Sequence, residues 1–172
     1  ESNEEIEAKY TTANANVNPT VGIATLENYR DDVNNTTETG YAVVRFDGEI
    51  QVDGSNTASS YWGSNPVAGD IIMFALDMDN GKVFFGLNGT FVGDPVSGSG
   101  GAFSGITSGE TIGIMLRPLD AVFKANFGNG YFGTTAVSSA QNPDDGIGIF
   151  EYDVPTGYRA LCTKSINAEE YS

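Results

Sequence analysis

The chain has 172 residues, among them 22 glycines, 8 tyrosines and 10 phenylalanines, a composition that favours strands and tight turns over helices. Its 23 acidic and 8 basic residues give a net charge of −15, which argues against nucleic acid or anionic membranes as partners, because both require clustered Lys and Arg. The absence of histidine excludes Ser-His-Asp and Cys-His catalytic groups, and no segment approaches the ~20 apolar residues of a membrane-spanning helix.

Four strands are predicted in the first third of the chain. In the first of them, Ile6, Ala8 and Tyr10 alternate with polar residues, which indicates one buried face. Asp47-Gly48 separates the last two strands and predicts a tight hairpin turn. Residues 28–40 are polar and lack periodicity, so we expect a loop there. The four predicted strands are residues 6–12, 19–26, 41–46 and 49–52.

A central strand is predicted in the middle of the chain. GDIIMFALDMD (69–79) is apolar on both faces from Ile71 to Leu76, as expected of a strand covered on both sides. Asn80-Gly81 is a pair that hairpin turns prefer, and KVFFGLNGTFV (82–92) is the returning strand. The flanking loops, residues 53–68 and 93–105, are longer than hairpins need, and long loops on a rigid sheet often carry binding sites.

Two further strand pairs are predicted in the last third. The first pair folds around Leu119-Asp120, and the long loop 129–148 separates it from the second. The polar tail 166–172 is expected to fray, and no segment of ten or more residues has helical periodicity. Roughly ten short strands with frequent turns predict an all-β fold, an antiparallel β-sandwich or jelly roll. The four strands are residues 110–118, 121–128, 149–154 and 157–163.

Three segments carry a resemblance to a known family. GDIIMFALDMDNGKVFFGLNGTF (69–91) resembles the signature of the SPRY (B30.2-like) domain, in which a Gly-Asp strand start, a D-[apolar]-D-x-G turn and an F-x-x-NG strand end follow one another. ANFG (125–128) resembles the closing strand of that family. YDVPTGYRALCT (152–163) resembles the ending of SPRY-like domains in bacteriophage and marine viral proteins. The resemblance extends over residues 69–163, and Val21-Gly22-Ile23-Ala24 matches an early family strand.

The resemblance implies a concanavalin A-like sandwich that binds other molecules and has no enzymatic activity. Its viral branch implies a domain of a phage virion protein, of the tail-fibre, receptor-binding or capsid-decoration type. Such a domain would form homo-oligomers and contact virion proteins or a glycan or protein of the host surface. The alternative is a soluble cellular adaptor that binds peptides or proteins. Residues 1–172 are expected to be one domain of a longer chain, because the family's first strands are missing.

Aromatic residues in two loops are the candidate ligand contacts. Tyr61 and Trp62, with Asn65 in the same loop, are placed to stack on a sugar ring or to contact a protein. The alternative is that Trp62 covers one end of the core. Tyr131 and Phe132 in the long loop raise the same two possibilities.

Acidic residues in two loops are candidate calcium ligands. Asp31 and Asp32 share one loop and Asp144 and Asp145 another, and each pair offers hard oxygen ligands for a structural Ca²⁺, although solvated loop acids are the simpler interpretation. The run from Asp77 to Gly81 resembles the start of an EF-hand loop but lacks its Glu at position twelve, so a hairpin turn is favoured.

Glycoside hydrolysis requires two carboxylates across a cleft, and Glu151 with Asp153 is the best pair that one strand face offers. No third acid supports this pair, so we expect no enzymatic activity. Cys162, the only cysteine, is expected to be a small buried apolar residue.

Overall fold

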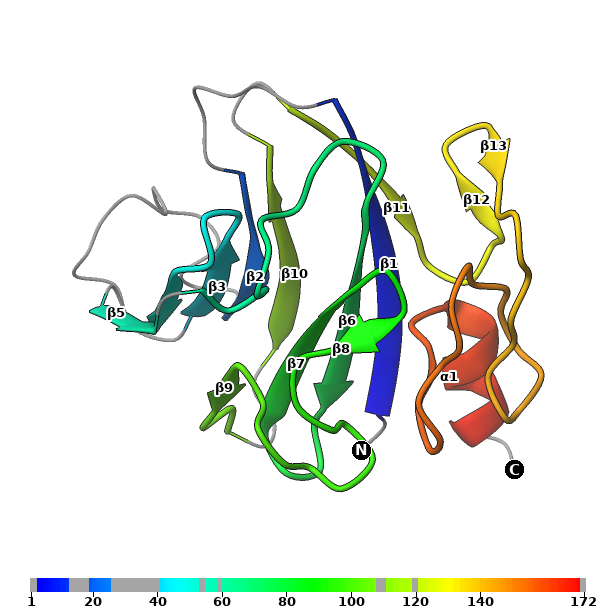
Figure 1. Ribbon diagram of the computed structural model, residues 1–172. Coiled ribbons are helices and arrows are strands. Elements are labelled where there is room, and N and C mark those ends of the chain that lie inside the picture. Colours follow the sequence, from blue (N-terminus) through cyan, green and yellow to red (C-terminus); the bar gives the residue numbers. More distant parts are fainter. Residues whose placement is uncertain are drawn as a thin grey trace.

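Two β-sheets pack face to face in the computed structural model, which describes residues 3–12, 19–25, 41–52, 55–58, 60–107, 111–118 and 121–170 (Figure 1). The first sheet has the order β11-β1-β6-β7-β8, with β9 paired to β7 and β14 paired to β1, and the second has the order β10-β2-β3-β4-β5. The first sheet comprises β1 (Asn3–Thr12), β6 (Ile71–Asp77), β7 (Lys82–Leu87), β8 (Thr90–Phe91), β9 (Phe103–Ser104), β11 (Val122–Asn126) and β14 (Arg159–Ala160). The second comprises β2 (Thr20–Thr25), β3 (Tyr41–Arg45), β4 (Ile50–Val52), β5 (Ser55–Ala58) and β10 (Ile112–Arg117).

The main core lies between the two sheets. Alternation along β1 directs Ile6, Ala8 and Tyr10 into it, where they pack with residues of the second sheet such as Ile23. The ring of Tyr10 lies edge-on to Phe46, with 4.8 Å between centroids. The predicted antiparallel β-sandwich is therefore confirmed, and β14, which runs parallel to β1, is an exception to the antiparallel order. That the chain is one domain of a longer protein stays a prediction.

The strand β6 is buried along its whole length, as the sequence predicts for a central strand. It lies between β1 and β7, and its inward residues Ile72 and Phe74 join the main core. Its outward residue Ala75 belongs to a second core with Phe84 and Phe150. Both faces of the strand are thus covered, which explains its continuous run of apolar residues.

A C-terminal layer, residues 127–170, provides the cover on the outer face of the first sheet. It contains the hairpin of β12 (Tyr131–Phe132) and β13 (Thr135–Ala136) and the helix α1 (Thr163–Glu170), which lie beside β1 and β11 in Figure 1. It also contains β14, which pairs with β1. Its buried side chains complete the second core, namely Phe150, Val154, Tyr158 and Ala160. Glu7, on the polar face of the first predicted strand, is buried under this layer, and so is Glu5, which precedes that predicted strand.

The C-terminal third departs from the predicted strand pairs. The expected hairpin around Leu119-Asp120 is wrong, because β10 pairs with β2 in the second sheet and β11 pairs with β1 in the first. The predicted strand 149–154 is also wrong, because this segment contributes one isolated bridge from Phe150 to Gln141. Of the predicted strand 157–163 only β14 forms. Instead of fraying, residues 166–170 belong to α1, and the Ser165 hydroxyl donates to the carboxylate of Asp145 at 3.4 Å.

Candidate functional site

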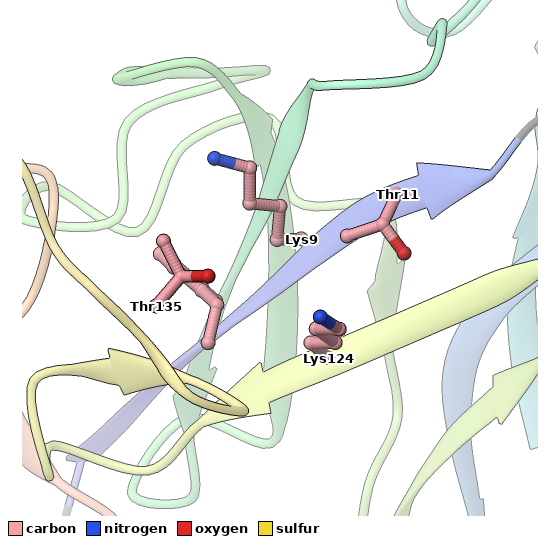
Figure 2. A pocket seen from close by; sticks show the side chains of 5 residues that line it. Lys9, Thr11, Lys124 and Thr135 are labelled. Atoms are coloured by element: carbon pink, nitrogen blue, oxygen red, sulfur yellow. The ribbon is translucent and has the colours of Figure 1, made fainter.

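A small hollow of about 60 Å³ lies between the outer face of the first sheet and the β12–β13 hairpin. We call it the lysine pocket. Figure 2 shows side chains of β1, β11 and the hairpin converging on it. Its lining residues are Lys9, Thr11, Lys124, Phe132 and Thr135.

Strand register brings the two lysines together. Lys9 on β1 lies directly opposite Lys124 on β11, and Thr11 follows Lys9 on the same outward face. Phe132 and Thr135 are likewise opposite each other in the hairpin. Like charges directly opposite each other destabilise an antiparallel pair. Two of the chain's 8 basic residues are therefore held together at a cost in stability.

The two lysines differ in their surroundings. The Lys9 ammonium lies 5.7 Å from the centroid of the Phe132 ring, a cation–π distance. Partial burial acts to raise the pKa of the Glu151 carboxyl, but hydrogen bonds from Ser138 and the positive charge of Lys9 outweigh it and the pKa is lowered. Lys124 forms no ion pair with any residue that the structure describes. Its charge is thus the one that the pocket leaves uncompensated.

Asn126 holds the hairpin against the sheet. Its side-chain carbonyl accepts hydrogen bonds from the backbone N–H of Gly128 at 3.0 Å and of Gly130 at 3.1 Å. Its amide donates to the Ile149 carbonyl at 2.9 Å and to Glu7 Oε2 at 3.3 Å. All hydrogen-bonding groups of a fully buried side chain are thereby used, and the chain is turned out of β11 into the hairpin.

Glu7 fastens the next part of the C-terminal layer to β1. Its two carboxylate oxygens accept hydrogen bonds from the backbone N–H of Glu151 and Tyr152, both at 2.9 Å. Burial raises the pKa of Glu7, and these hydrogen bonds partly oppose that rise. Strands β1 and β11 therefore hold the C-terminal layer, through Glu7 and Asn126, against the sheet face that carries Lys9 and Lys124.

Glu5 lies on the same face of β1, completely buried beneath the C-terminal layer. Neither of its carboxylate oxygens has a hydrogen-bond partner within the described part of the chain. Burial, and then the nearby charges of Glu7 and Asp153, raise the pKa of Glu5 well above its ordinary value. The buried group is therefore favoured in its protonated form.

The first aromatic pair of the sequence analysis lies mainly inside the protein. Trp62 is buried in the main core, and its indole N–H donates to the Arg45 carbonyl at 2.9 Å. The Tyr61 hydroxyl donates to the carbonyl of Phe85 and accepts from its N–H, both at 3.3 Å, and burial raises the pKa of Tyr61 to about 12. Asn65 is exposed in the same loop. Of the two possibilities for Trp62, packing at the core is the one the structure shows, because only 8% of the residue is exposed.

The second aromatic pair is divided between surface and pocket. Tyr131 is 48% exposed, whereas Phe132 is buried and lines the lysine pocket. Both aromatic residues were predictable from the sequence as candidate contacts, whereas Lys9 and Lys124 were not. The available signal was a lysine at an outward position in each of two predicted strands, and it becomes informative only when those strands are known to pair.

Among the described residues, the acids considered as metal ligands do not form a metal-binding group. Asp144 and Asp145 are exposed, and Asp145 Oδ1 accepts a hydrogen bond from the Ile147 N–H at 2.8 Å. The Asp77 carboxylate is occupied by Asn80, whose backbone N–H donates at 2.9 Å, so that run is the predicted hairpin turn. Within the ranges described, no three Asp, Glu or Cys side chains are grouped to hold a metal ion. Asp31 and Asp32 lie outside the described residues.

The two acids of the possible catalytic pair have different surroundings. Glu151 is held by Ser138, whose backbone N–H donates at 2.6 Å and whose hydroxyl also donates, while Asp153 is exposed. Cys162 is half-buried against the second core and forms no disulfide. None of the helices in the described ranges is long and apolar enough to cross a membrane.

Comparison with known proteins supports the fold. No protein-family model and no curated protein matches the sequence. Among solved structures, the SPRY domain of human HERC1 is similar with a TM-score of 0.53 and 20% sequence identity, over 72% of each chain. A second human SPRY domain gives a TM-score of 0.48 and 16% identity, over 71% of this chain and 74% of that one. The fold is therefore that of a SPRY-type β-sandwich, and the resemblance to the viral branch gains no support from these human structures.

Proposed function

We propose that the chain is a non-enzymatic protein-binding module, and that its contact surface is the β12–β13 hairpin with the lysine pocket beside it. The observation that carries this proposal is a hollow that contains the uncompensated Lys124 and is walled by Phe132, in a hairpin that also exposes the ring of Tyr131. Exposed aromatic residues are among those that dominate protein contacts, and a hollow with a few polar groups is typical of a binding site. Asn126 and Glu7 hold this surface rigid, which lowers the entropy lost on binding.

The fold and the surface chemistry favour the cellular adaptor over the virion protein. Family resemblance implies a binding sandwich in either setting, and the similar solved structure is a human domain. A virion role with a host glycan as ligand would be favoured if Trp62 were exposed and could stack on a sugar ring, but Trp62 is buried. Tyr131 therefore remains as the proposed aromatic contact, with a protein or peptide as its ligand.

A selection from random linear peptides displayed on a surface tests the proposal. We expect the immobilised protein to enrich peptides with a shared motif, and we expect Tyr131→Ala to weaken their binding by roughly fivefold or more, as interface aromatic residues do. Val96→Ala is the matched control, because Val96 is a 62% exposed apolar residue in the β8–β9 loop. If no motif is enriched, or if enriched peptides bind Tyr131→Ala as well as the unaltered protein, the proposed surface is wrong.

A further inference from the structure

We propose that the lysine pocket binds one carboxylate, the side chain of an acidic residue in an extended peptide segment of a partner protein. This inference rests on the proposed function and names the chemistry of its ligand. Lys9 and Lys124 provide the positive charge and Thr135 provides a hydroxyl (Figure 2), while Phe132 provides an apolar lining.

Local charge favours a monoanion. Lys9 and Lys124 each carry one positive charge, and Glu151 is close enough for Lys9 to lower the pKa of its carboxyl. The surroundings of the pocket thus have a net charge of about +1, which one carboxylate neutralises. A phosphate monoester carries a charge of about −1.5 to −2 at neutral pH, so its complex with the pocket would keep an excess of negative charge. The overall charge of −15 adds a general repulsion against polyanions.

The hydrogen-bond donors of the pocket also match a carboxylate. The Thr11 hydroxyl already donates to the Val122 carbonyl at 3.2 Å, so it has no proton left for a ligand. Free donors remain on Lys124, on Lys9 and on the exposed Thr135. A carboxylate with two oxygens can accept from these donors without requiring a further one.

The position of the pocket favours an extended segment. Among the described strands, β11 is the outermost of the first sheet, so the pocket opens at a sheet edge. Val122 lies two residues from Lys124 on the same face of β11 and is 44% exposed. Alternate residues of an extended chain are about 6.8 Å apart, so a peptide running along β11 with its acid at Lys124 places a second side chain over Val122. The expected motif is an acidic residue with an apolar residue two positions away.

Nuclear magnetic resonance of the lysine side chains tests the assignment directly. The probes are the capped tripeptide acetyl-Gly-Glu-Gly-amide, its Gln analogue and its phosphoserine analogue, titrated at low salt. We expect the Glu peptide to shift the terminal methylene signals of Lys9 and Lys124 and the Gln peptide to leave them in place. Lys124→Gln should weaken Glu-peptide binding roughly threefold to fivefold, the upper range for an exposed ion pair, and Lys124→Arg should retain it. Lys164→Gln is the matched control, because Lys164 is exposed on α1.

Four outcomes of these titrations and of a check for self-association would overturn the assignment. The first is that the Glu and Gln peptides shift the lysine methylene signals equally, and the second is that Lys124→Gln and Lys164→Gln weaken Glu-peptide binding equally. The third is that the phosphoserine peptide binds about tenfold more tightly than the Glu peptide. The fourth is that the protein self-associates and Lys124→Gln abolishes the self-association. The last would assign the pocket to a second copy of the chain. If the selected peptides bind Lys124→Gln as tightly as the unaltered protein, the proposed carboxylate ligand is wrong, whereas the proposed protein-binding function is still supported. If the Glu tripeptide binds but no library peptide is enriched, carboxylate binding by the lysine pocket is supported and the proposed protein-binding function is wrong.

Discussion

The Asn126 side chain shows how much one residue determines at the candidate site. It belongs to the ANFG segment that suggested the family, yet the segment alone did not reveal its role. Its amide joins β1, the turn after β11 and Ile149 of the C-terminal layer. Shortening this residue leaves the Gly128 and Gly130 N–H groups and the Ile149 carbonyl without their partner.

We therefore expect Asn126→Ala to destabilise the protein by about 3 kcal/mol, since each buried group left without a partner costs about 1–3 kcal/mol. Urea unfolding followed by tryptophan fluorescence measures the change in the free energy of unfolding. Asn65→Ala, at an exposed loop position, is the control and should stay within about 0.5 kcal/mol of the unaltered protein. Equal effects of the two substitutions would show that Asn126 does not hold the hairpin.

Glu5 makes the stability depend on pH in the direction opposite to most acidic residues. Its pKa is raised in the folded protein above the ordinary value of 4.5, so the folded state binds the proton more tightly than the unfolded state. The free energy of unfolding therefore falls as the pH rises from about 4.5 towards the raised pKa. Replacement by Gln removes the titrating group, so Glu5→Gln should lose less stability between pH 4.5 and pH 7 than the unaltered protein.

Urea unfolding at several pH values across this range gives the two profiles. Asp144→Asn, at an exposed position, is the control and should follow the unaltered protein. Parallel profiles for Glu5→Gln and the unaltered protein would mean that Glu5 does not titrate in this range.

At the scale of elements, local turns were predictable and long-range pairings were not. Asn80-Gly81 joins β6 to β7 as expected, because Gly81 has a φ of 62° and a β-carbon there would lie 2.3 Å from the Ile106 carbonyl oxygen. Leu119-Asp120 looked like an equivalent turn, but the strands on either side enter different sheets. A turn signal shows that the chain reverses, and it does not show which sheet receives the next strand.

The C-terminal layer escaped prediction for a related reason. Phe150 and Val154 are apolar residues in a short run that resembles a strand, but their role is to fill the second core from irregular backbone. The helix α1 has no acidic residue in its first turn and no basic residue in its last, so it lacks the charges that favour a helix end. The burial of Glu7 was not predicted, because alternation along a strand indicates only one covered face.

The lysine pair predicts a trade-off within the β1–β11 ladder. Removing one of two like charges opposite each other relieves repulsion, so Lys124→Gln should raise the free energy of unfolding at low salt by about 0.2–1 kcal/mol. Thermal unfolding in dilute buffer measures it, with Lys164→Gln on α1 as the control for loss of a positive charge. If Lys124→Gln instead lowers the free energy of unfolding by more than Lys164→Gln does, Lys124 stabilises the fold. There would then be no reason to assign Lys124 to a ligand.

At the scale of the whole molecule, bulk charge concealed the candidate site. A net charge of −15 argues against polyanionic partners, but it is an average over a surface that contains a local positive hollow. The fold was predictable from the sequence, and so were Tyr131 and Phe132 as candidate contacts, because aromatic residues in long loops can be recognised without knowledge of the strand pairing. Lys9 and Lys124 are far apart in the sequence, and only the pairing of β1 with β11 brings them together.

The same contrast predicts opposite effects of salt on stability and on binding. Self-repulsion among 23 acidic residues destabilises the compact state, and added NaCl screens it, so the melting temperature should rise by several degrees between about 10 mM and 300 mM NaCl. Binding of the Glu tripeptide depends on attraction to Lys124 and should weaken over the same range, because the Debye length falls from about 30 Å to less than 8 Å. Calorimetry and the lysine-detected titration, run in matched buffers, give both trends. If salt strengthened both stability and binding, apolar contact with Phe132 or Val122 would outweigh charge, and the lysines would have no part in recognising the ligand.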